Sequence, residues 1–157
     1  MRKAFLMLVV VVSVVLASTT VTLAADNWIG TWKQNLSKST YSPGPAPKSA
    51  TRKYEAFEGG YKFTQDGIDD QGKPTHIEYS AKFDGKDYPV KGTPNIDAVS
   101  LKRIDDHTWE GVQKKGGKST VTNRNVVSRD GKTLTATATG KNVQGQDVHN
   151  TLVFDKQ

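Results

Sequence analysis

Hydrophobic and polar residues alternate through most of the chain after residue 26. The clearest case is residues 75–83, THIEYSAKF, where every second side chain is apolar or small. That period of two is typical of a strand with one buried and one wet face. Helical periodicity is hard to find in the same region. We predict about ten strands, at residues 28–35, 51–58, 61–66, 74–83, 87–91, 98–104, 108–114, 118–128, 132–140 and 147–155.

Glycine-containing turns separate these segments. Asp84-Gly85-Lys86 and Asp130-Gly131-Lys132 are the strongest, because Asp-Gly suits a hairpin that needs positive φ at glycine. Turns that recur every eight to twelve residues or so favour an all-β sandwich or barrel. Short connections make consecutive strands antiparallel neighbours, and closure removes both exposed edges. The fold class that we predict is a single antiparallel up-and-down β-barrel of about 8–10 strands.

Residues 27–50 do not fit this pattern of hairpins. Trp28 and Ile29 are expected to cover a closed end of the barrel, with Trp32 inside on the first strand, because tryptophan buries a large apolar surface. Residues 37–50 contain three prolines at alternate positions and predict a stiff, polyproline-like loop across the open end. Such a loop is either a lid over a binding site or a surface crossover without a role.

Two stretches carry a resemblance to a known group. Residues 30–33, GTWK, resemble the Gly-x-Trp opening of lipocalins and fatty-acid-binding proteins. Residues 116–140 and 150–157 are similar in order and spacing to the last three strands of fatty-acid-binding proteins. More narrowly, the chain resembles exported bacterial proteins described as lipocalin-like. Membership of this calycin group implies a barrel that holds a small hydrophobic or amphipathic ligand.

The resemblance also implies an inward-pointing arginine at Arg124. Leu152 and Phe154 stand where fatty-acid-binding proteins carry an Arg-x-Tyr pair, so half of that family's carboxylate anchor is missing. A lone buried arginine needs a partner. Either it pairs with an anionic group of the ligand, or it packs on Trp32 or pairs with an internal acid.

The first 25 residues have the layout of a secretory signal peptide. A basic start precedes an apolar run of about 14 residues, shorter than the roughly 20 that a membrane span needs, and small residues follow at Ala24 and Ala25. We therefore predict a signal peptide over 1–25, a barrel domain over 26–157, and a periplasmic or secreted product without a stable membrane span after cleavage. An uncleaved anchor is the alternative.

Composition narrows the chemistry. The chain has no cysteine, and both methionines, Met1 and Met7, lie in the predicted signal peptide, which excludes disulfides and thiolate metal sites. Without Arg2 and Lys3 the charge falls from +6 to about +4. The basic residues are scattered singly, so no nucleic-acid-binding stripe is indicated.

No pattern argues for an enzyme. His76, His107 and His149 are far apart, and Asp66, Asp69 and Asp70 lack the spacing of a calcium loop. Neither a Gly-x-Ser-x-Gly elbow nor a glycine-rich phosphate loop occurs. We expect no metal and no cofactor.

The predicted function is therefore non-enzymatic binding of a small hydrophobic or amphipathic molecule inside the barrel. The alternative is a solid barrel that acts through its surface, as an inhibitor, an adhesion protein or an envelope-associated module. The sequence leaves the oligomeric state open. Strand alternation and the resemblance together give the candidate ligand-binding residues: Trp32, Phe63, Ile77, Tyr79, Phe83, Leu101, Trp109, Arg124, Leu134 and Phe154.

Overall fold

A computed structural model describes residues 26–157, so the predicted signal peptide lies outside the described residues. All ten predicted strands are confirmed, with ends shifted by a few residues at most. They are β1 (Gly30–Gln34), β2 (Ser49–Phe57), β3 (Gly60–Ile68), β4 (Pro74–Lys82), β5 (Tyr88–Pro89), β6 (Ala98–Arg103), β7 (Thr108–Lys115), β8 (Lys118–Val127), β9 (Thr133–Lys141) and β10 (Asp147–Lys156).

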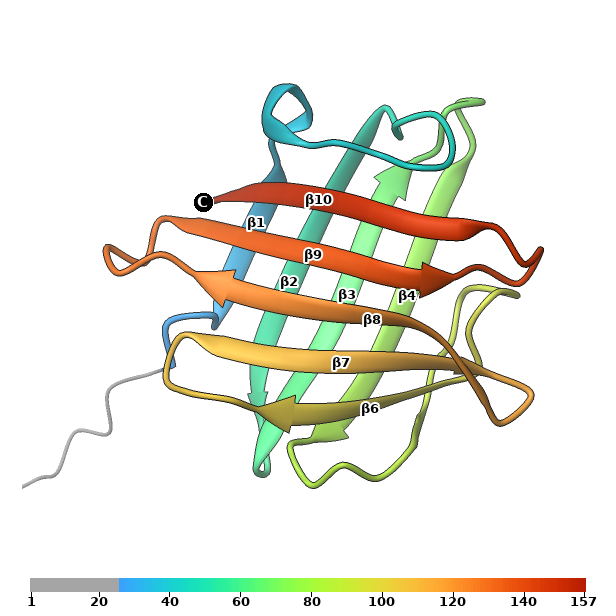
Figure 1. Ribbon diagram of the computed structural model, residues 1–157. Coiled ribbons are helices and arrows are strands. Elements are labelled where there is room, and N and C mark those ends of the chain that lie inside the picture. The colour runs from blue at the N-terminus through green and yellow to red at the C-terminus, as the bar shows by residue number, and fades with distance from the viewer. Residues whose placement is uncertain (1–25) are drawn as a thin grey trace, which may run out of the picture.

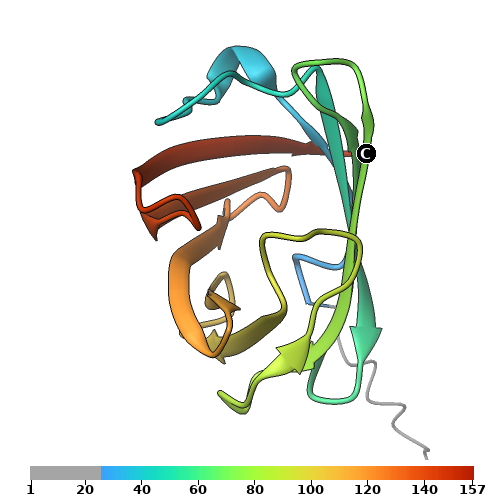
Figure 2. The same cartoon turned by 90° about the vertical axis from the view of Figure 1, so that its right-hand side faces the viewer.

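The strands form one antiparallel sheet that curls into a nearly closed barrel. Their order is β4-β3-β2-β1-β10-β9-β8-β7-β6-β5, so every chain neighbour from β5 to β10 and from β1 to β4 pairs directly. The first and last strands also pair, through Trp32–Lys156 and its neighbours. β1–β4 stand opposite β6–β10 and cross them steeply (Figures 1 and 2). An isolated bridge between Glu78 and Lys91 links β4 to the segment after β5 and narrows the remaining gap.

Both Asp-Gly turns have the backbone conformation that their sequence predicts. Gly85 and Gly131 have φ of +74° and +70°, values that L side chains rarely adopt. In each turn the aspartate accepts a backbone hydrogen bond from the lysine two residues on: Asp84 from Lys86, and Asp130 from Lys132. The Asp130 turn joins the paired strands β8 and β9. The Asp84 turn leads from β4 to β5, which lie at opposite ends of the strand order and do not pair, so the hairpin predicted at Asp84 was wrong.

Aromatic side chains fill one end of the barrel. Trp28 is fully buried, and its ring lies 5.1 Å from that of Trp109 and 5.8 Å from that of Phe83. Trp32 is also fully buried, and its Nε1 donates to the Trp28 carbonyl at 2.8 Å. The prediction that Trp28 plugs the barrel end with Trp32 inside is confirmed. Within residues 26–157, the Trp28 Nε1 is the one buried side-chain polar atom without a hydrogen-bond partner.

The proline-containing segment differs from its prediction. It begins with a 3-10 turn, η1 (Leu36–Lys38), and then follows β10 rather than crossing freely. Thr40 bridges Thr151, and the His149 amide donates to the Ser42 carbonyl at 2.7 Å. β1 ends at Gln34, so the first half of β10 is paired with β9 on one edge but has no strand on the other. The segment pairs with backbone groups of that edge, which are costly to leave unpaired. In the part of the chain that is described, no helix has the length and apolar character needed to cross a membrane.

Candidate ligand cavity

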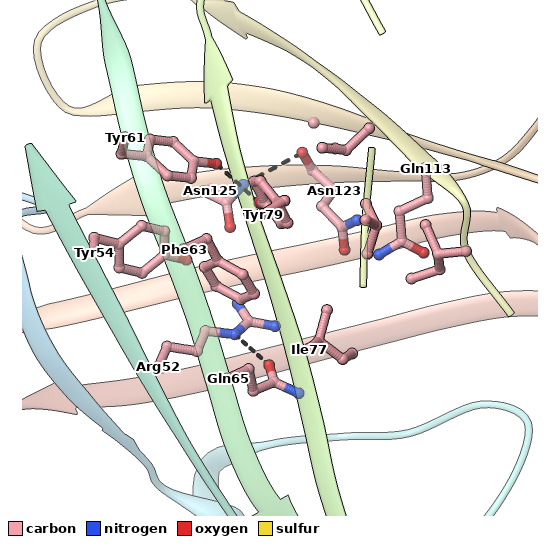
Figure 3. Close-up of a pocket in the computed structure, with 14 residues that line it drawn as sticks. Arg52, Tyr54, Tyr61, Phe63, Gln65, Ile77, Tyr79, Gln113, Asn123 and Asn125 are labelled. Atoms are coloured by element: carbon pink, nitrogen blue, oxygen red, sulfur yellow. Dashed lines mark hydrogen bonds between the residues drawn. The ribbon is translucent and has the colours of Figure 1, made fainter. Parts of the chain in front are cut away.

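The barrel contains an interior cavity of about 120 Å³ above the aromatic plug. Strands from both halves of the barrel contribute to its wall, and Figure 3 shows the side chains that face it. None of residues 36–48 takes part. The lining residues are Arg52, Tyr54, Tyr61, Phe63, Gln65, Ile77, Tyr79, Val90, Ile96, Val99, Gly111, Gln113, Asn123 and Asn125.

Strand register builds one wall of this cavity in two rows. Arg52 pairs with Gln65, and Gln65 pairs with Ile77, so these three side chains form a row across β2, β3 and β4. Tyr54, Phe63 and Tyr79 form the next row towards the plug. Side chains two apart on a strand share a face, which makes both rows point inward.

Arg52 is the interior cation. Its Nε donates to Gln65 Oε1 at 2.8 Å, and its guanidinium carbon lies 4.2 Å from the centre of the Phe154 ring. It lies within hydrogen-bonding reach of the Tyr54 hydroxyl, and its guanidinium carbon is also 5.8 Å from the centre of the Phe63 ring. It forms no salt bridge with any carboxylate of the described residues. Neutral polar groups and two aromatic rings therefore position the guanidinium, and no carboxylate among residues 26–157 balances its charge.

The opposite wall is rich in carboxamides. Gln113 comes from β7, and Asn123 and Asn125 come from β8. Asn125 is only 6% exposed, and its sole hydrogen bond is a long one, 3.5 Å from Nδ2 to the Asn123 carbonyl oxygen. Gly111 on β7 also lines the cavity, and a side chain at this position would press against Leu101 and Val99. The cavity is thus polar on the side that faces Arg52.

A chain of aromatic hydrogen bonds closes the floor. Trp109 Nε1 donates to the Tyr61 hydroxyl at 3.1 Å, and that hydroxyl lies 3.2 Å from the Tyr79 hydroxyl. Burial raises the pKa of Tyr61 well above its ordinary value of 10.0 and also raises the pKa of Tyr79. Burial raises the pKa of Tyr54 as well, opposed by the positive charge of Arg52. The three hydroxyls therefore stay protonated at neutral pH.

The structure separates the sequence-predicted residues into three groups. Phe63, Ile77 and Tyr79 line the cavity. The other inward residues, Trp32, Phe83, Leu101, Trp109, Leu134 and Phe154, pack in the core around it or against that core. Arg124 is in neither group. The barrel is thus hollow in its middle and filled towards the plug.

The inward placement of Arg124 was wrong. Its side chain is 50% exposed on the outer face, where its Nη1 lies 2.8 Å from the Glu110 carboxylate. Neither proposed partner, a ligand group inside the barrel or Trp32 with an internal acid, applies. Strand alternation explains the error, because Val121 and Val127 on β8 are buried and fix the odd-numbered positions as the inner face.

Sequence reasoning missed Arg52, Gln65, Gln113, Asn123 and Asn125. The signal for Arg52 was present: Ala50 and Tyr54, two positions away on either side, are apolar and buried. The same alternation between Val121 and Val127 marks Asn123 and Asn125 as inner residues. These polar residues were missed because, apart from Arg124, only apolar positions were counted as interior.

A wider basin of about 310 Å³ adjoins the cavity and shares Ile77, Ile96 and Gln113 with it. The loop before β6 and the turn between β9 and β10 supply most of its remaining wall. We call this basin the mouth. Within residues 26–157, no group of three or more histidine, aspartate or glutamate side chains is arranged to hold a metal ion.

Comparison with known proteins supports the architecture. No family model matches the chain, and no curated protein matches it in sequence. Among solved structures, the zebrafish ileal bile acid-binding protein in complex with cholic acid matches with a TM-score of 0.52. The match covers 83% of this chain and 99% of that protein, at 12% identity. The chain has a calycin-like barrel fold. At this identity the likeness concerns the fold alone, and the calycin-like barrel described here carries its own set of cavity side chains.

Proposed function

We propose that this calycin-like barrel binds a small amphipathic molecule in its interior, with an anionic group of that molecule held by Arg52. The observation that carries the proposal is the guanidinium of Arg52, which lies beside the 120 Å³ cavity and has no carboxylate partner among the described residues. We propose binding without catalysis, since the cavity side chains offer hydrogen-bond donors and acceptors but no carboxylate or histidine.

Electrostatics favour an anion at this position. Arg52 is half-buried and has no counter-ion among the described residues, and an arginine–carboxylate pair gains two parallel charge-assisted hydrogen bonds. Arg52 is pre-oriented for such a pair because Gln65 and Phe154 fix its Nε and its face. The ligand would therefore meet a donor pair that needs little further ordering. The cholic acid complex of the zebrafish protein is an example of a barrel of this fold around an acid.

The test is native mass spectrometry on the protein purified from its own host without detergent. We expect a reproducible extra mass that is lost on denaturation, and loss of that mass in Arg52→Gln. Arg124→Gln is the matched control, because it removes the same charge from the outer face of the barrel. It should keep the bound mass.

Two outcomes would contradict the proposal. Loss of the ligand from both variants alike would show that net charge, rather than the interior arginine, matters. A clean apo mass, together with no saturable site for lipid-like or aromatic acid probes, would refute interior binding. It would favour the alternative of a module that acts through its surface.

Export remains part of the proposal. It rests on the basic, apolar and small-residue order of residues 1–25. Fractionation of the host cells, followed by N-terminal sequencing of the recovered protein, tests it. Recovery from the cytoplasm with Met1 intact would contradict it.

A further inference from the structure

We infer that the ligand of this cavity is a small, single-ring aromatic carboxylate that bears its own hydrogen-bonding substituent, rather than a long-chain or polycyclic lipid. This inference rests on the proposed function and names the class of molecule that the site accepts. Three observations carry it: the volume of the cavity, the carboxamides opposite Arg52, and the aromatic row beneath them.

Volume sets the first limit. The cavity measures about 120 Å³. This is close to the roughly 150 Å³ of an apolar cavity that holds one benzene ring and well below the about 300–1,000 Å³ of pockets for drug-sized ligands. The mouth gives a further 310 Å³, but it is open and lies beyond Ile77, Ile96 and Gln113. A single ring fills the inner cavity, and only a substituent needs to extend towards the mouth.

Polarity sets the second limit. Asn125 is nearly fully buried, and no side-chain hydrogen bond within the described residues uses its oxygen; Gln113 and Asn123 also face the cavity without side-chain hydrogen bonds. A hydrocarbon chain packed against these carboxamides would displace the water that hydrates them and would form no hydrogen bond with them. A hydroxyl or amino substituent would pair with them. Sites built to hydrogen-bond a ligand reject analogues that lack the group.

The aromatic row gives the third indication. The rings of Phe63 and Tyr79 are stacked, with centres 4.8 Å apart, and Tyr54 meets Phe63 edge-on at 5.2 Å. All three line the cavity next to the Arg52 row. A planar ring continues this packing with offset or edge-to-face contacts, while its carboxylate reaches Arg52.

The experiment is calorimetric titration of the full protein, freed of ligand by unfolding and refolding, with four named probes. These are 4-hydroxybenzoate, benzoate, 4-hydroxybenzamide and dodecanoate. We expect one site per chain for 4-hydroxybenzoate. Benzoate should bind about tenfold more weakly because it lacks the hydroxyl, and the amide at least tenfold more weakly because it lacks the charge. Dodecanoate should also bind at least tenfold more weakly.

Variants on β8 test the carboxamide role directly. Asn123→Leu should bring the affinity ratio of 4-hydroxybenzoate to benzoate towards one. Thr122→Leu, the adjacent outer-face position on the same strand, should leave that ratio unchanged. If Asn123→Leu does not fold, as judged by its melting curve, Gln113→Leu provides the same readout from β7. An unchanged ratio in a folded inner variant would overturn the inference.

The outcomes also distinguish this inference from the proposed function. Tighter binding of dodecanoate than of 4-hydroxybenzoate, lost in Arg52→Gln, would overturn the aromatic ligand class and leave interior binding standing. Failure of every probe to saturate would count against both.

Discussion

Removing the Tyr61 hydroxyl is expected to destabilise the barrel more than its size suggests. Tyr61 is 1% exposed, and its oxygen accepts the hydrogen bond from Trp109 Nε1 at 3.1 Å. In Tyr61→Phe the indole N–H stays buried without a partner, because Trp109 is fully buried. Leaving a buried donor unsatisfied costs about 1–3 kcal/mol. The free energy of unfolding should therefore fall by about 2 kcal/mol.

Thermal unfolding followed by near-UV circular dichroism measures this change. For a domain of this length, 2 kcal/mol corresponds to a fall in Tm of about 6–10 °C. Tyr79→Phe is the matched control, since it removes the neighbouring hydroxyl but keeps the bond between Trp109 and Tyr61. It should cost less than about 1 kcal/mol. A Tyr61→Phe variant within about 0.5 kcal/mol of the parent would refute the reasoning, because the indole would then have found another acceptor.

Three further predictions concern pH, closure and the core. Above pH 10 the unfolded chain releases tyrosine protons that the buried Tyr54 and Tyr61 retain, so the free energy of unfolding should fall by up to about 2.7 kcal/mol per pH unit. A titration followed at 295 nm should show these two tyrosines ionising only as the protein unfolds. Ionisation at lower pH, before unfolding, would contradict this. Gly92→Ala should lower the free energy of unfolding, measured in urea, by about 2 kcal/mol or more, because φ is +88° and the added Cβ would lie 2.3 Å from the His76 carbonyl oxygen. The control Gly85→Ala has φ of +74° but open space around it, and should cost only about 1 kcal/mol. Equal costs for the two variants would argue against the clash. Phe154→Ala should lower the free energy of unfolding by about 3–5 kcal/mol in the same assay, because the ring is fully buried. It should also weaken ligand binding, because the ring contacts the guanidinium of Arg52. Unchanged affinity would show that the ring does not position the guanidinium.

The strands and hairpins were predictable because they depend on local chemistry. Asp-Gly pairs specify the positive φ and the backbone hydrogen bonds of their turns, as Asp84 and Gly85 show. Alternation then indicates which face is buried. The path of residues 36–48 was not predictable in the same way. This segment pairs with the edge of β10 that β1 leaves free, more than 100 residues away in the sequence. That edge is free only because β1 is shorter than β10, which the local sequence of residues 36–48 does not reveal.

The cavity was predictable in part. Phe63, Ile77 and Tyr79 followed from their apolar alternation. The interior arginine was misplaced because a family resemblance took precedence over the strand's own phase, which places Val121 and Val127 inside and Arg124 outside. Arg52 shows the converse: a charged residue between two buried ones was assigned to neither face. Polar residues in phase with a buried face are better interpreted as candidate site residues than as exceptions.

The pairing of β1 with β10 has a consequence for how the chain folds. Trp32 and Lys156 are partners in the sheet although 124 positions separate them, so the contact that joins the two halves has nearly the greatest sequence separation that the barrel allows. Non-local contacts of this kind slow folding, since the entropy of closing the loop is lost before the contact forms. A chain delivered from its N-terminus lacks its closing strand until β10 has been made. The barrel, and with it the finished wall around Arg52, therefore forms only once β10 is present, and loss of β10 should leave an open sheet with β1 as an exposed edge.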